Sequence, residues 1–172
     1  MHSWKTKLRE TILRLQADKG IVPKIAILGI GNELNGDDAA GVLMARELMK
    51  HYADQPQRSN LVIYDCGTLP ENFSGPLRKF RPDLILMLDA GSFGGKPGDL
   101  LLASSEESEG MSFSTHSLPP SVFADFLINE LNCVVQLLLV QAENIDFCDP
   151  LNSQIEKTIR ETVPALAEII PG

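Results

Sequence analysis

Acidic side chains stand at or just after the ends of three apolar segments of the chain. Asp37 and Asp38 follow the first segment within a glycine-rich stretch, and Asp65 and Asp89 end two later ones. If these segments are parallel strands of one sheet, their carboxyl ends share one edge and the acids converge there. Converging carboxylates repel one another unless a metal ion or a shared proton relieves the charge. The pattern predicts a cation site, although each acid alone could cap a helix or a turn.

His116 is the candidate partner of these acids. It lies in a polar stretch before a predicted helix, whereas His2 and His51 stand at a terminus and a helix end, where a structural or exposed histidine is expected. One imidazole with two carboxylates suits a borderline ion such as nickel or zinc better than magnesium or calcium. Three protein ligands leave a coordination position open for water or substrate. These residues predict a hydrolytic or binding site that faces a metal, without choosing the substrate.

The glycine-rich stretch also invites a nucleotide-binding interpretation, as in a flavodoxin-like module. The dinucleotide fingerprint G-x-G-x-x-G requires glycine at position 34, where the chain has Leu34. No G-K-[ST] sequence follows, so a phosphate-binding P-loop is excluded. Asp37 and Asp38 would also repel a pyrophosphate at the start of the next helix. The stretch is better suited to a cation than to a phosphate.

Alternating strands and helices must position these residues. Continuous apolar runs predict strands that are covered on both faces, and helical spacing of apolar residues predicts the segments between them. Strands are expected near 24–29, 61–65, 83–89, 99–103 and 134–141, and helices near 38–51, 71–79, 119–131 and 151–169. The order predicts a three-layer α/β/α sandwich around a five-stranded, mostly parallel twisted sheet, with residues 99–103 as an edge strand.

An additional helix is predicted before the first strand. Its apolar residues recur at helical spacing over 3–19, and Gly20 is placed to end it. We therefore divide the chain into an N-terminal helical extension, residues 1–22, and a single α/β domain, residues 23–172. The apolar side of this helix is expected to pack on the sheet layer rather than to dock a partner; it comprises Trp4, Leu8, Ile12 and Leu15.

Composition and charge exclude several classes of function. The 172 residues are 44% hydrophobic and 22% charged, as in an ordinary folded domain, and the formal net charge is −8. This charge opposes binding to nucleic acid or to an anionic membrane. The three cysteines form no C-x-x-C pair, no apolar run is long enough for a membrane span, and the N-terminal residues are too charged for the core of a signal peptide. We expect a cytoplasmic protein, by default a monomer.

Four segments of the chain are specific in their order and spacing. They are Gly-Ile-Gly-Asn-Glu-Leu-Asn-Gly-Asp-Asp-Ala-Ala-Gly-Val at 29–42, Asp-Cys-Gly-Thr at 65–68, Leu-Asp-Ala at 88–90 and Thr-His-Ser-Leu-Pro at 115–119. These segments resemble the motifs of the nickel-iron hydrogenase maturation endopeptidases, which process the hydrogenase large subunit. The resemblance runs from about Lys24 to Glu168 and leaves only the N-terminal helix without a counterpart.

The resemblance implies a role for each candidate residue. The family's nickel-recognising acids and histidine fall on Asp38, Asp89 and His116, which are also the implied catalytic residues. Asp37 and Asp65 are possible supporting residues. Asp38 is an aspartate, as in the subgroup that serves formate-hydrogenlyase-type and related hydrogenases, whereas some other members have glutamate at this position. The family's Asp-Gly-Gly motif is changed here by Cys66, which brings a thiol near the expected cleft.

The resemblance also implies a reaction. A peptidase of this family hydrolyses the C-terminal extension from the large-subunit precursor once nickel has been inserted. Nickel is then supplied by the substrate, and the resting enzyme is expected to be metal-free. A carboxylate or a metal-bound water could be the nucleophile, and an aspartate general base, giving an aspartic-type peptidase, is an alternative. A non-catalytic nickel-binding or escort protein for hydrogenase assembly remains the competing interpretation.

Overall fold

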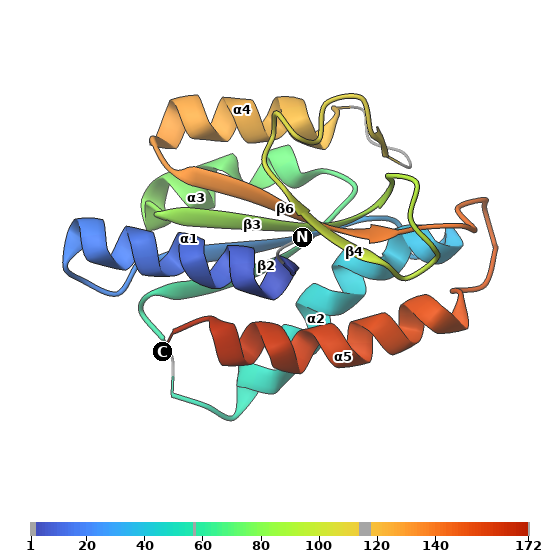
Figure 1. The fold of residues 1–172 in the computed structure, drawn as a ribbon, viewed down its shortest axis with the longest axis horizontal. Helices are drawn as coiled ribbons and strands as arrows, with labels where there is room; N and C mark the ends of the chain where they lie inside the picture. Colours follow the sequence, from blue (N-terminus) through green and yellow to red (C-terminus); the bar gives the residue numbers. More distant parts are fainter. Residues whose placement is uncertain (1–2, 57, 114–117, 172) are drawn as a thin grey trace.

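The computed structural model describes residues 3–56, 58–113 and 118–171 and contains the elements that the sequence predicts (Figure 1). The strands are β1 (Ile25–Ile30), β2 (Leu61–Gly67), β3 (Leu84–Ser92), β4 (Leu100–Ala103), β5 (Ser112–Phe113) and β6 (Val134–Gln141). The helices are α1 (Trp4–Lys19), α2 (Ala40–Ala53), α3 (Ser74–Phe80), α4 (Pro120–Leu131) and α5 (Ser153–Ile169), with 3₁₀ turns η1 (Gly36–Ala39) and η2 (Pro70–Phe73).

The sheet confirms the predicted α/β class. Its main path runs in the order β2-β1-β3-β6-β4. The strands β2, β1, β3 and β6 are parallel to their neighbours, and β4 is an antiparallel edge strand. A short sixth strand, β5, pairs antiparallel with the end of β3 and was not predicted, because two residues carry no readable periodicity.

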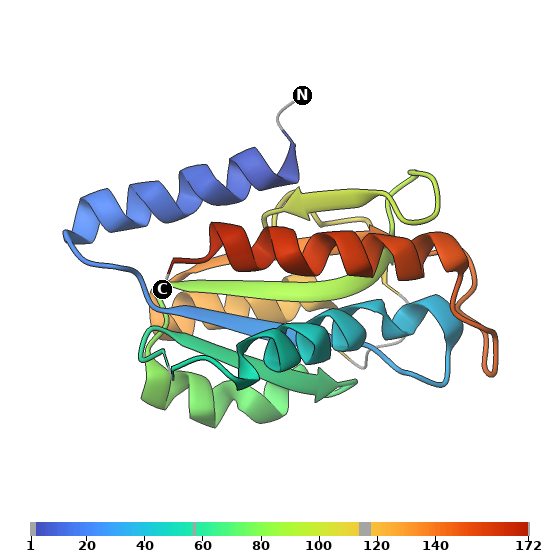
Figure 2. The same cartoon turned by 90° about the horizontal axis from the view of Figure 1, so that it is seen from below.

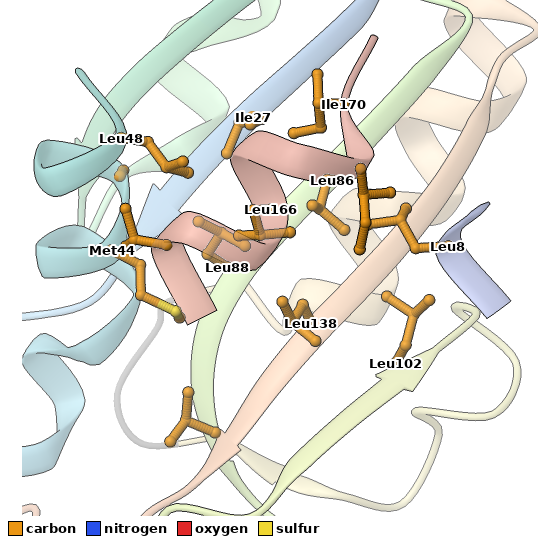
Figure 3. Close-up of a cluster of buried hydrophobic side chains, with 14 of the residues drawn as sticks. Leu8, Ile27, Met44, Leu48, Leu86, Leu88, Leu102, Leu138, Leu166 and Ile170 are labelled. Atoms are coloured by element: carbon orange, nitrogen blue, oxygen red, sulfur yellow. The ribbon is translucent and has the colours of Figure 1, made fainter. Parts of the chain in front are cut away.

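Helices cover both faces of the sheet (Figure 2). On one face α2 and α5 enclose the larger core cluster, which includes Leu48, Leu86 and Leu166. Figure 3 shows this cluster, with side chains converging from α1, α2, α5 and the sheet. On the other face α3 and α4 enclose a second cluster that includes Met87 and Phe123. Burial on both faces explains why the central strands read as continuous apolar runs.

The N-terminal helix packs on the sheet layer as expected. The Ser3 hydroxyl caps α1 by accepting a hydrogen bond from the Thr6 N–H, and Gly20 ends the helix in the left-handed region, at φ +68°. Leu8 and Ile12 are buried in the larger cluster, with Trp4 and Leu15 packed against it. None of the helices within the described residues is long and apolar enough to cross a membrane.

Candidate active site at the carboxyl edge of the sheet

Asp38 lies in η1, the 3₁₀ turn that joins β1 to α2 at the carboxyl ends of the parallel strands, here called the carboxyl edge. Its side chain is fully buried, and its Oδ2 accepts a hydrogen bond of 3.1 Å from the Asn32 N–H. Gly41 lets this segment approach the sheet, because a Cβ there would stand 2.1 Å from the Leu88 carbonyl oxygen of β3. Asp38 is therefore held beside the end of β3.

Asp89 lies within β3, in register with Leu139 of β6, and is fully buried. Its Oδ1 accepts a hydrogen bond of 2.8 Å from the Ala90 N–H. The predicted strand end at residue 89 was too early, since β3 continues to Ser92 through its pairing with β5 and β6. Strand alternation places the Asp89 side chain on the face that carries Met87 and is covered by α3 and α4.

His116 falls within residues 114–117, which lie outside the described residues. Its role as a ligand therefore stays a prediction. Across residues 3–56, 58–113 and 118–171 no group of three His, Cys, Asp or Glu side chains is placed to hold a metal ion. Of the three expected ligands, Asp38 and Asp89 lie within the described residues, and both stand at the carboxyl edge.

Asp37 binds backbone groups of a distant loop. The loop between β6 and α5, residues 142–152, donates three N–H groups to this fully buried carboxylate. Glu143 and Asn144 donate to Oδ2 at 2.9 and 2.8 Å, and Asn152 donates to Oδ1 at 2.8 Å. The Asp37 N–H in turn donates to the Asn144 carbonyl oxygen at 2.7 Å. Asp37 thus joins the Asp38 segment to the β6–α5 loop.

Asp65 is ion-paired and points away from the Asp89 side. Its Oδ2 accepts a hydrogen bond of 2.6 Å from Arg46 Nε, and Arg46 also contacts Glu33 at 2.6 Å. These two acids raise the pKa of the Arg46 guanidinium above its ordinary value. Asp65 follows Ile63 on the α2 face of the sheet, whereas Asp89 lies on the opposite face. Asp65 and Asp89 therefore lie near the ends of two strands that follow one another along the chain, but their side chains are on opposite faces of the sheet.

Cys66 is buried, and its thiol is expected to be unreactive in the folded protein. Its side chain joins the α3/α4 cluster, and its thiol lies 3.8 Å from the Tyr64 carbonyl oxygen. Burial, and secondarily the nearby charge of Asp65, raise the pKa of the Cys66 thiol to about 12. The thiol is therefore protonated at neutral pH, when it is a poor nucleophile and a poor metal ligand.

Sequence reasoning missed Arg46 and the backbone partners of Asp37. Arg46 lies in a predicted helix, and nothing in its neighbours along the chain indicates two acidic partners. The partners of Asp37 are main-chain N–H groups, which every residue except proline possesses. No sequence signal marks them.

Comparisons with known proteins identify the family of this chain. A sequence model of the HycI family, described as hydrogenase maturation protease, matches residues 42–172. The chain belongs to the hydrogenase maturation protease family. The hydrogenase 3 maturation protease of Escherichia coli K12 is 31% identical over 138 residues, which cover 80% of this chain and 84% of that protein. A Methanocaldococcus jannaschii protein, provisionally named as such a protease, is 33% identical over 86% of this chain and 88% of its own length.

Solved structures of such maturation proteases share the fold. The crystal structure of the nickel-iron hydrogenase maturation protease HycI from Thermococcus kodakarensis KOD1 superposes with a TM-score of 0.76 at 30% identity and covers 86% of this chain and 92% of its own. The solution structure of the endopeptidase HycI from Escherichia coli gives 0.66 at 28% identity, covering 82% and 87%. As a member of this family, the chain is a peptidase.

Proposed function

We propose that this maturation protease is an endopeptidase that removes the C-terminal extension from the precursor of a nickel-iron hydrogenase large subunit after nickel insertion. It recognises the nickel, which the substrate supplies, through Asp38, Asp89 and His116. The observation that supports this proposal best is the placement of two fully buried carboxylates, on η1 and on β3, at one edge of the sheet.

Chemistry favours nickel as the occupant of this edge. Two carboxylates and one imidazole offer mixed oxygen and nitrogen donors, which suit a borderline transition metal. Charged groups are stabilised inside a protein when an opposite charge accompanies them, so a cation delivered with the substrate complements Asp38 and Asp89. A precursor without nickel would lack this interaction and would bind less well.

The hydrolytic step then depends on the position of the scissile peptide bond relative to the attacking group. Coordination of the substrate's nickel fixes the scissile peptide bond beside a water molecule or a carboxylate at the carboxyl edge. Water attacks the peptide carbonyl carbon, the carbon–nitrogen bond breaks, and a proton passes to the departing amine. An aspartate of the pair is the candidate general base, which would make the enzyme aspartic in type.

The decisive experiment compares two forms of one precursor. The purified protein, at about one-hundredth of the precursor concentration, is incubated with nickel-loaded and with nickel-free large-subunit precursor, and precursor mass is followed over time. We expect loss of a C-terminal peptide from the nickel-loaded form alone. Equal cleavage of both forms contradicts nickel recognition, and binding without any cleavage favours the escort protein.

We further propose that the protein acts in the cytoplasm as a monomer and carries no metal of its own between turnovers. The three cysteines, which form no C-x-x-C pair, favour a reducing compartment. The net charge of −8 opposes self-association. Light scattering of the purified protein tests the monomer, and elemental analysis of the same sample tests the metal-free resting state.

A further inference from the structure

Three apolar side chains are exposed beside the candidate active site. Leu34 follows β1 and is 59% exposed, while Ile145 and Phe147 lie in the β6–α5 loop and are 38% and 71% exposed. We call these three residues the apolar patch. Single exposed apolar residues are ordinary on a protein surface, but grouped ones at a functional edge indicate a binding surface.

Main-chain hydrogen bonds hold the two loops of the apolar patch together. The Cys148 N–H donates a hydrogen bond to the Leu34 carbonyl oxygen at 2.7 Å. Because Cys148 follows Phe147 in the chain, this hydrogen bond holds Phe147 near Leu34. The Asp37 carboxylate ties the same β6–α5 loop to the segment that carries Asp38. Both loops lie at the same end of the molecule in two perpendicular views (Figures 1 and 2).

A groove connects the apolar patch with the end of β3. Its volume is about 190 Å³, and Ile145 lines it together with Gly91, Ser92, Phe113 and Ala142. Gly91 stands two residues after Asp89 in the same strand. A polypeptide that covers Ile145 therefore also covers a groove that reaches the end of β3.

Charge limits what can cover this surface. Residues 31–39 and 142–152 together hold six acidic residues and no lysine or arginine. Asp37 and Asp38 are buried and Glu33 pairs with Arg46, so the surface charge of the two loops comes from Glu143, Asp146 and Asp149. A second copy of this chain would bring acid against acid, and a nucleic acid or an anionic membrane would be repelled. The surface instead complements a protein face that is apolar at its centre and basic around it.

We propose that the apolar patch is the docking surface for the hydrogenase large-subunit precursor, and that the precursor contacts it with an apolar area surrounded by basic side chains. This inference rests on the proposed function. Docking there places the precursor's C-terminal segment over the groove and its nickel beside Asp38 and Asp89. The patch contributes binding energy remote from the scissile bond.

Steady-state kinetics with the nickel-loaded precursor test the docking surface. Phe147→Ser and Leu34→Ser are each expected to raise KM about tenfold and to leave kcat within about twofold, because they remove binding that is equal in ground and transition states. Leu13→Ser is the matched control, since Leu13 is 63% exposed on α1, away from both loops. Phe147→Leu keeps an apolar side chain and should retain most of the wild-type affinity.

The possible outcomes separate this inference from the proposed function. If wild-type protein cleaves the precursor and neither serine variant changes KM relative to Leu13→Ser, the docking surface is wrong and the peptidase assignment stands. If wild-type protein binds without cleaving, the peptidase assignment is wrong, and the dissociation constants of the same variants decide the docking surface. If the wild-type protein neither binds nor cleaves the precursor, both proposals are overturned.

Salt dependence tests the basic character of the partner. Raising sodium chloride from about 50 to 500 mM screens charges across an interface, so KM of the wild type should rise several-fold. A KM that does not change with salt overturns the predicted basic surround. Urea unfolding of each variant confirms that a changed KM belongs to a folded protein.

Discussion

The carboxylate of Asp37 accepts a hydrogen bond of 2.8 Å from the backbone N–H of Asn152, 115 residues further along the chain. Two more N–H groups from the same loop, of Glu143 and Asn144, complete its contacts. Asp37 and Asp38 are adjacent in η1 and both are buried. Asp37 joins this turn to the β6–α5 loop, whereas Asp38 lies beside the end of β3. These neighbouring acids of the same type therefore have different contacts.

Replacing Asp37 should destabilise the whole fold. In Asp37→Asn the amide nitrogen faces N–H donors, so at least one buried donor loses its acceptor, and a charged acceptor is lost as well. We expect a loss of about 3 kcal/mol in the free energy of unfolding. Urea titration measures it. Asp146→Asn, on the exposed part of the same loop, is the control and should change little.

Substitution of the proposed nickel-recognising residues should abolish processing without unfolding the protein. Asp38→Asn, Asp89→Asn and His116→Ala are each expected to lower the rate of precursor cleavage by about a hundredfold or more, as loss of a metal-orienting group does. Mass spectrometry of the nickel-loaded precursor measures the rate. Asp125→Asn, exposed on α4, is the control. Wild-type rates for all three variants would show that these residues are wrongly assigned.

Gly41 should tolerate no side chain. A Cβ at this position would stand 2.1 Å from the Leu88 carbonyl oxygen and 2.3 Å from that of Ile30, both of which are backbone atoms of the sheet. Gly41→Ala must move α2 and the Asp38 segment, and we expect a loss of about 3 kcal/mol or more. Gly75→Ala is the matched control, since nothing lies within 4 Å of its Cβ position.

The Gly75→Ala control should be neutral or slightly stabilising, by about 0.5 kcal/mol, because alanine restricts the unfolded chain. Thermal unfolding of both variants, followed by circular dichroism, measures the difference. If Gly41→Ala were as stable as Gly75→Ala, the close approach of α2 to β3 would not exist in solution.

Thiol reactivity should separate the three cysteines. Cys148 is exposed, whereas Cys66 and Cys133 are buried, and burial raises the pKa of their thiols to about 12 and about 11. At pH 8 a disulfide reagent such as Ellman's is expected to modify Cys148 rapidly and the other two only on unfolding. Counting released chromophore before and after urea addition measures this. Two fast thiols in the native protein would contradict the buried position of Cys66 or of Cys133.

The same two pKa values predict a loss of stability at alkaline pH. In the unfolded chain these thiols ionise near their ordinary pKa of about 8.5, but in the folded protein they stay protonated to about pH 11 or 12. Their contribution to stability is therefore complete below pH 8 and is lost as pH rises toward 12. Urea midpoints from pH 8 to 10.5 should fall less steeply in Cys66→Ala than in the wild type.

The sequence by itself determined the layers of this protein. Continuous apolar runs predict buried strands because both faces of the central sheet are covered, and Gly20 predicts the end of α1 because it can adopt a positive φ. The acids were placed at the carboxyl edge because they follow these runs. Local rules suffice where a residue's neighbours along the chain decide its environment.

Only the tertiary structure decided what each acid contacts. The strands run two or three residues past Asp65 and Asp89, and side-chain alternation then sends these two acids to opposite faces. The contacts of Asp37 are backbone N–H groups more than a hundred residues away, and their position depends on how the β6–α5 loop folds. Sequence periodicity describes faces and ends of elements, but pairing between distant segments is set by their packing in three dimensions.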